Sequence, residues 1–394
     1  MDCWLLEVRV AQDTASFSVP PSCDVVAGQV IELDTPDVSG LFRIDRIEDA
    51  GAKTVEATRV MSEVYDRPVA EEEIVPVPPV VAPLPVWPVM MNLPLLRGDE
   101  NPDAVWLAAT AEPWPGSVAV YGSDTGETWR IEGRLERPVM IGQTLSELRF
   151  ATSGSFDRGG PLTVAFSAGS LSSISDNALL SGGNLAAVGN AVTGAWELFQ
   201  FRDVELVGLD TWALSMRLRG QRGTDAFVPD VWPVGSTVVI LDEAVTPLNR
   251  TPSQRGAIRE YRFGPFSKPV DHPSFRQISH ASDGAGLRPY RPVHLSARNQ
   301  ANGDIALNWI RQSRVDADLW GVADVPLGEA TEVYLVRVVA GGVVRRETTV
   351  MSPQWIYTAG DQMTDGIVGS VSFEVAQISD RLGPGPFGKV EFND

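Results

Sequence analysis

The chain has 394 residues and a formal net charge of −19, from 51 acidic and 32 basic side chains. Hydrophobic residues make up 43% and charged residues 21%, which is typical of a globular protein with two or three domains. The excess of acids argues against general affinity for nucleic acid or anionic lipid, because both rest on clustered Lys and Arg. No run of about 18 uncharged apolar residues occurs, so the sequence predicts no membrane span.

The N-terminal segment 1–13 has acids at positions 2 and 7 and no basic leader, so it is not typical of a secretory signal. Cys3 and Cys23 are too few for a disulfide framework. We interpret them as buried thiols of a protein made in a reducing compartment. A single bridge or a metal site are the alternatives.

Short runs in which apolar and polar residues alternate recur along the chain. Such alternation, with β-branched and aromatic residues, is typical of half-buried strands. One segment, 175–190, predicts a short helix capped by Ser175 or Asp176 and interrupted by Gly182 and Gly183. The sequence therefore predicts an all-β fold, with several sandwich-like or barrel-like domains in series and few short helices. The predicted strands are 28–34, 41–49, 53–60, 117–124, 128–136, 162–169, 236–243, 304–311, 332–342 and 370–378.

A proline-rich segment, VPVPPVVAPLPVWPVMMNLP at 75–94, contains seven prolines. Proline at this density prevents both helix formation and the hydrogen-bonded pairing of strands, and it favours an extended conformation. Because the segment is also apolar, we expect an arm that lies on a protein surface. A second boundary falls near 286–297. The predicted domains are 1–70, the arm at 71–95, a central region at 96–287 and a last module at 288–394.

The last module follows a recognisable order of strands. Trp309 lies early in it, within ALNWIR, and a later strand ends in DRLGPGPFG. This order resembles a fibronectin type III sandwich, which implies that Trp309 is buried. Phe373 stands where that family usually has a tyrosine, so the hydrogen bond that a tyrosine hydroxyl makes at this corner is in doubt.

Motifs that carry chemistry are scarce. The three histidines are His272, His280 and His294, and the first two are eight residues apart beside Asp271, which is not a metal-ligand spacing. No nucleophile elbow, Cys-x-x-Cys, His-Glu-x-x-His or Walker loop is present. The Gly-rich run 122–129 favours a hairpin turn over a phosphate loop. We therefore expect no enzyme activity and name no catalytic, cofactor-binding or metal-binding residue and no cofactor.

The stretch LSMRLRGQRGTD at 214–225 places Arg217, Arg219 and Arg222 among glycines. In so acidic a chain, we interpret Arg217 and Arg219 as an internal ion-pairing edge of a strand. Gly220 and Gly223 would form the turn that follows. A backbone nest that binds an anion is the alternative.

Several stretches resemble, in the same order, the central tail-tip or host-specificity proteins of tailed phages and gene transfer agents. The longest members of that family carry an N-terminal TIM-barrel-like domain. The resemblance does not include that domain or most of the hub region, so we expect this sequence to be a C-terminal portion, the product of a split gene or a short member of the family. The resemblance is carried by 28–66, 118–148, 169–208, 216–245, 287–338 and 375–388.

The resemblance implies a structural component of a virion tail tip or baseplate, assembled in the bacterial host cytoplasm, that contributes to host attachment and genome delivery. Its implied partners are itself as a homotrimer, other tail-tip proteins (hub, distal tail, tape measure), a host-surface receptor such as a glycan, and transiting DNA without specific binding. We expect 1–70 to dock into a trimeric hub and the sandwich to project outward. Acidic side chains that line the axial channel of the tail would repel the phosphates of the DNA that passes through it.

Two other classes of function stay open. One is an envelope polysaccharide-degrading enzyme of the tail tip, with the sandwiches as ancillary binding modules. The other is an exported adhesin, which the absence of a signal-like N-terminal segment disfavours.

Overall fold

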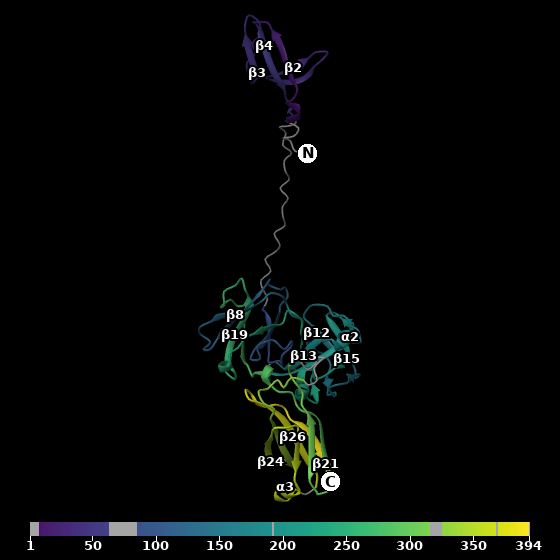
Figure 1. Ribbon diagram of the computed structural model, residues 1–394. Coiled ribbons are helices and arrows are strands. Elements are labelled where there is room, and N and C mark those ends of the chain that lie inside the picture. The colour runs from purple at the N-terminus through teal and green to yellow at the C-terminus, as the bar shows by residue number, and fades with distance from the viewer. Residues whose placement is uncertain (1–7, 63–84, 191–192, 316–324, 368, 394) are drawn as a thin grey trace. The chain divides into compact units, whose positions relative to one another are not determined.

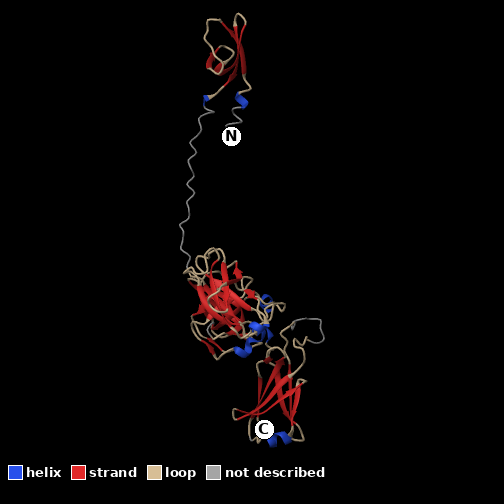
Figure 2. Ribbon diagram, turned by 90° about the vertical axis from the view of Figure 1, so that its left-hand side faces the viewer, coloured by secondary structure: helices blue, strands red, loops and turns tan. Residues whose placement is uncertain are grey.

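The computed structural model describes residues 8–62, 85–190, 193–315, 325–367 and 369–393. The chain divides into two compact units, Met1–Val80 and Val81–Asp394. Both consist mainly of strands with few short helices (Figure 2), so the predicted fold class is confirmed. No helix in the described part of the chain is long and apolar enough to cross a membrane.

The first unit contains one antiparallel sheet, formed by β1 (Thr14–Val19), β2 (Val30–Asp34), β3 (Ser39–Asp49) and β4 (Lys53–Arg59) in the order β1-β4-β3-β2 (Figure 1). Alternate side chains of each strand pack on one face, because the side-chain period of a strand is two. Phe42, Ile44, Val55 and Ala57 form its small buried cluster. Cys23 is a free, half-buried thiol, so it is less buried than expected, and Cys3 lies outside the described residues.

The centre of the second unit is a closed six-stranded barrel. Pairing runs β15-β12-β9-β17-β13-β14, and β14 pairs back with β15. Because the barrel is closed, each of the six strands pairs with a neighbour on both of its sides, along at least part of its length. The strands are β9 (Ile141–Thr144), β12 (Leu162–Phe166), β13 (Leu185–Asn190), β14 (Ala195–Gly208), β15 (Thr211–Leu218) and β17 (Thr237–Ile240).

Two further sheets pack beside the barrel. The first has β5 (Trp87–Met91), β6 (Val105–Thr110) and β18 (Thr246–Leu248). The second has β7 (Val118–Ser123), β8 (Arg130–Leu135), β19 (Ile258–Pro265) and β20 (Arg276–Ala281). Trp106 and Ala108 of β6 pack against barrel residues, while Leu107 packs toward β7. Because β6 is covered on both faces, all six of its residues are buried and its sequence does not alternate.

The proline-rich segment is only partly the arm that we predicted. Residues 63–84 lie outside the described part, but 87–91 form β5, and Met91 is fully buried. This corrects the prediction of an arm over 71–95. Pro88 is tolerated because β5 is an edge strand of its sheet, where a missing N–H breaks no ladder on the open side.

The predicted helix at 175–190 is also shorter than expected. α2 spans Asp176–Leu180, and the Ser175 hydroxyl accepts a hydrogen bond from the N–H of Ala178 at 3.2 Å, which confirms the Ser175 cap. After the two glycines the chain enters β13, whose pairing with both β14 and β17 overrides its helical pattern. The run 122–129 lies in the β7–β8 hairpin turn, as predicted.

The last module is a two-sheet sandwich. One sheet has β21 (Val293–Asn299), β22 (Ile305–Ile310) and β25 (Gln354–Tyr357), and a short helix, α3 (Ala359–Thr364), follows it. The other has β23 (Tyr334–Ala340), β24 (Val343–Val350) and β26 (Val371–Ser379), which pairs with β27 (Gly383–Pro384) and β28 (Gly388–Phe392). Trp309 is 4% exposed in the core between the sheets, as predicted. Phe373 is buried beside it.

Candidate functional site

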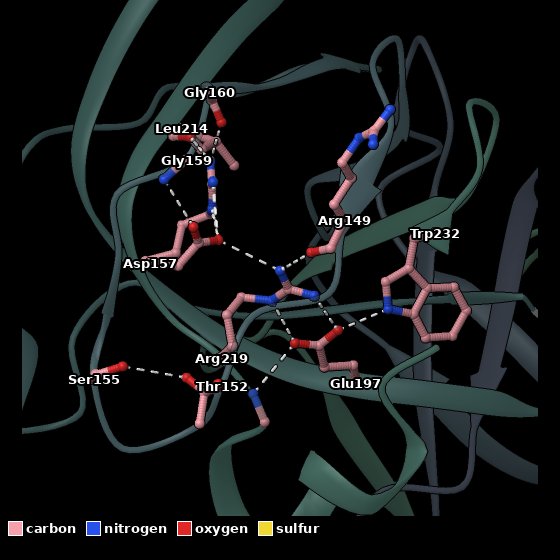
Figure 3. A network of polar contacts seen from close by, with 12 residues as sticks. Arg149, Thr152, Ser155, Asp157, Gly159, Gly160, Glu197, Leu214, Arg219 and Trp232 are labelled. Carbon is pink, nitrogen blue, oxygen red and sulfur yellow. Dashed lines mark hydrogen bonds and ion pairs between the residues drawn. The ribbon is translucent and has the colours of Figure 1, made fainter. Parts of the chain in front are cut away.

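Two arginines of LSMRLRGQRGTD, Arg217 and Arg219, belong to a buried polar network, and Figure 3 shows Arg219 between Asp157 and Glu197. Arg219 follows β15 and is fully buried, as is Glu197 of β14. The two side chains form a bidentate pair, with Nε–Oε1 at 2.6 Å and Nη2–Oε2 at 2.8 Å. Glu197 also accepts from the indole N–H of Trp232 at 2.7 Å and from the backbone N–H of Gly220 at 3.2 Å.

Arg217 and Asp157 form the second pair of the network. The Arg217 Nε lies 3.0 Å from Asp157 Oδ2, and its Nη1 donates to the carbonyls of Gly160 and Leu214. Burial opposes ionisation of Asp157, but the Gly159 N–H and the charges of Arg217 and Arg219 outweigh it and lower the Asp157 pKa. Two cations thus face two carboxylates.

This network connects the barrel to the short strands β10 (Leu148–Arg149), β11 (Phe156–Asp157) and β16 (Val231–Trp232). Nη1 of Arg219 donates to the Arg149 carbonyl at 2.7 Å, and Trp232 reaches Glu197 from β16. Since each of its nitrogens donates within the protein and its side chain is fully buried, Arg219 is not accessible to a phosphate in solution. The interpretation as an internal ion-pairing edge is confirmed.

The turn after β15 is a kinked 3₁₀ segment, η2 (Gln221–Phe227), that begins at Gly220. Gly220, Arg222 and Gly223 have φ values of 60°, 53° and 76°, in the left-handed region that favours glycine. The two glycines form the turn as predicted. A Cβ on Gly223 would lie 2.2 Å from the Tyr290 ring, so the close approach of this ring requires glycine.

We expect Gly223→Ala to destabilise the second unit by about 1–3 kcal/mol more than Gly235→Ala does. Gly235 has a similar φ of 88° but nothing within 4 Å of an added Cβ, so it bears only the backbone cost of about 1–2 kcal/mol. Urea unfolding of the full chain measures both. Equal losses in the two variants would contradict the packing of Tyr290 on Gly223.

Arg222 differs from the two buried arginines. Its side chain is exposed, and no hydrogen bond or ion pair joins it to another described residue. It lines a cavity of about 160 Å³, which we call the Arg222 cavity. A second, more open hollow of about 730 Å³ shares Arg222, Gly223 and Tyr290 with it. Other residues that line the Arg222 cavity are Asn92, Trp196, Phe227, Asp283, Arg288 and Tyr290.

The histidines do not come together as metal ligands. His272 contacts Ser274 at 2.7 Å, His280 contacts Asn92 Oδ1 at 3.1 Å, and His294 lines the second hollow. Among the residues that the structure describes, no group of three or more His, Cys, Asp or Glu could hold a metal ion.

We expect the stability of the fold to depend on pH through His280. Burial lowers its pKa from 6.5 to about 4, Asp283 partly offsets this, and Arg250 adds to it. Between about pH 4 and pH 6.5, His280 is protonated in the unfolded chain and neutral in the folded chain. The free energy of unfolding therefore falls as the pH falls through this range. From about pH 7.5 to about pH 5 the loss from this group is about 2 kcal/mol. Urea unfolding at both pH values measures this loss. The decrease in stability between them should be about 2 kcal/mol smaller for His280→Asn than for the wild type. Equal decreases would show that His280 is not the group responsible.

Sequence reasoning missed the partners of the arginines. Glu197 lies in ELFQF and Trp232 in DVWP, and neither stretch has a motif that marks a buried polar side chain. The one usable signal was Glu197 itself, a lone acid in the apolar run 195–201. Its partners come from strands remote in sequence, so only the closed barrel brings them together.

Comparison with known proteins gives one match of sequence. Residues 139–239 match the family described as "Rcc01698-like, C-terminal", and Rcc01698 is a gene transfer agent protein. This region, about a quarter of the chain, begins just before β9 and ends within β17, so it corresponds to the closed barrel and its ion-pair network. No curated protein matches the chain.

Two solved structures are similar at low scores. The rat CD45 extracellular region, domains d3–d4, has 10% identity and a TM-score of 0.22, covering 39% of this chain and 72% of that one. The chicken CNTN1 FN1–FN3 domains have 12% identity and a TM-score of 0.20, covering 79% of this chain and 98% of that one. Scores this low carry no argument about this chain.

Proposed function

We propose that this protein is a structural component of a phage or gene transfer agent tail tip, which contributes to host-surface attachment and genome delivery. The single observation that carries the proposal is the Rcc01698-like barrel at 139–239. The resemblance of stretches on both sides of the barrel to tail-tip proteins, in the same order, supports extending the proposal to the whole chain.

The architecture of the second unit suits a structural role. Four buried apolar clusters fill the barrel, its junction with the neighbouring sheets, the paired sheets and the sandwich. Arg217 and Arg219 stabilise the barrel from within rather than facing solvent. Such modules are rigid supports on which binding surfaces are carried.

In this proposal the protein works as a homotrimer beside the hub, distal-tail and tape-measure proteins at the virion tail tip. The net charge of −19 would repel transiting DNA if acids line the axial channel. These partners follow from the resemblance alone, and particle imaging tests them.

The test is a deletion of the gene in the producing strain, with complementation by the wild-type gene. Particles without the chain are expected to lack finished tails or to fail to adsorb to cells. In intact particles, density for the chain should lie on the tail axis with threefold symmetry. Density in the capsid, or sixfold density on the tube wall, would refute the placement. Release of reducing ends from purified envelope polysaccharide would favour the degrading enzyme instead.

A further inference from the structure

The Arg222 cavity has the features of a small ligand site. We propose that it binds one carboxylate-bearing sugar unit, of the uronic acid type, in a host-surface polysaccharide. The inference deepens the proposed function and rests on it for the source of the sugar. Two observations support it: the charge of the cavity wall and the aromatic rings in that wall.

The cavity wall carries a net positive charge in a strongly acidic chain. Arg222 and Arg288 line it, and Asp283 is the one acid in the wall among the described residues. Asp283 already pairs with Arg288 at 2.7 Å. The nearby Asp225 pairs with Arg291. Arg222 is thus left without a carboxylate, and a guanidinium binds carboxylates in a bidentate manner.

Aromatic rings supply the second observation. They lie in the wall of the cavity, which holds about 160 Å³. Phe227 and Tyr290 contribute aromatic rings to the wall, and Arg288 covers the Phe227 ring at 4.7 Å. The adjoining larger hollow leaves space for neighbouring units of a polysaccharide.

The backbone holds Arg222 in place. Its φ of 53° is fixed between Gly220, which packs on Asp225, and Gly223, which packs on Tyr290. Because packed neighbours already hold the backbone at this position, little backbone entropy is lost when the Arg222 side chain binds a ligand.

The experiment is saturation-transfer difference NMR of the full chain with sodium glucuronate, and with glucose as the neutral sugar of the same ring size. Glucuronate is expected to bind and glucose to bind at least tenfold more weakly. Arg222→Gln should weaken glucuronate binding at least tenfold. The matched control is Arg345→Gln, an exposed arginine of β24, which should leave binding unchanged.

Three outcomes would overturn the proposal. They are no binding of glucuronate, equal binding by both arginine variants, and displacement by inorganic phosphate with no preference for glucuronate over glucose. Circular dichroism of each variant confirms that the fold is intact, and Arg222→Lys should restore part of the affinity because it keeps the charge without the planar fork.

Failure here is distinguishable from failure of the proposed function. Tail-tip density with no effect of Arg222→Gln on binding would sink the sugar site alone. Glucuronate binding by a chain that is absent from the tail would sink the tail-tip role alone.

Discussion

Replacement of Arg219 by methionine is expected to lower the free energy of unfolding of the second unit by about 3–5 kcal/mol, because it leaves the buried Glu197 carboxylate without its counter-charge. Methionine keeps the apolar stem of the side chain, so the loss reports mainly on the guanidinium and its contacts with Glu197 and the Arg149 carbonyl. Urea unfolding of the full chain, followed by circular dichroism, measures the loss.

The control for this prediction is Arg345→Met, at an exposed position of β24, which should change stability by less than about 0.5 kcal/mol. The double variant Arg219→Met/Glu197→Leu removes both charges and should recover part of the loss. It will not recover all of it, because the Trp232 indole and the Gly220 N–H both lose their acceptor. A loss below about 1 kcal/mol for Arg219→Met would contradict the role of this pair.

Replacement of Trp309 by alanine is expected to cost about 3–5 kcal/mol, since it empties the largest side-chain volume in the sandwich core. The indole ring packs edge-on against Tyr334, with 5.2 Å between ring centroids and an angle of 74°. Differential scanning calorimetry of the full chain should show an earlier transition for this module.

The neighbouring residue provides a matched control. Ile310 is the next residue on β22 but points to the other face, and it is 57% exposed. Ile310→Ala should therefore lower the free energy of unfolding by much less than Trp309→Ala does, because it removes little buried area. Similar losses at the two positions would mean that the sheet register is wrong.

The sequence predicted strands best where one face of a strand meets solvent. In β3 the exposed Arg43 and Asp45 alternate with the buried Phe42 and Ile44, so the period of two is visible in the letters. The same holds for β22, where Trp309 alternates with exposed neighbours. The ten predicted strands are all present.

Two strands that are covered on both faces, β6 and β14, escaped prediction. β6 reads VWLAAT and β14 begins AWELFQF, and burial on both sides removes the alternation that marks a strand. The same cause explains β5, whose prolines favoured an arm. At this strand the packing of Val89 and Met91 against the barrel, together with an edge position for Pro88, outweighed local preference.

By itself the sequence determined the fold class, the turn glycines, the burial of Trp309 and the pairing of Arg217 and Arg219 inside an acidic chain. These follow from local period, backbone freedom and charge balance, which are read along the chain. Only the tertiary structure decided that Glu197, Asp157 and Trp232 are the partners and that the six strands close into a barrel. It alone placed Arg222, Trp196 and Tyr290 around one cavity. Those contacts join residues far apart in sequence, and their distances depend on how the sheets pack rather than on any local pattern.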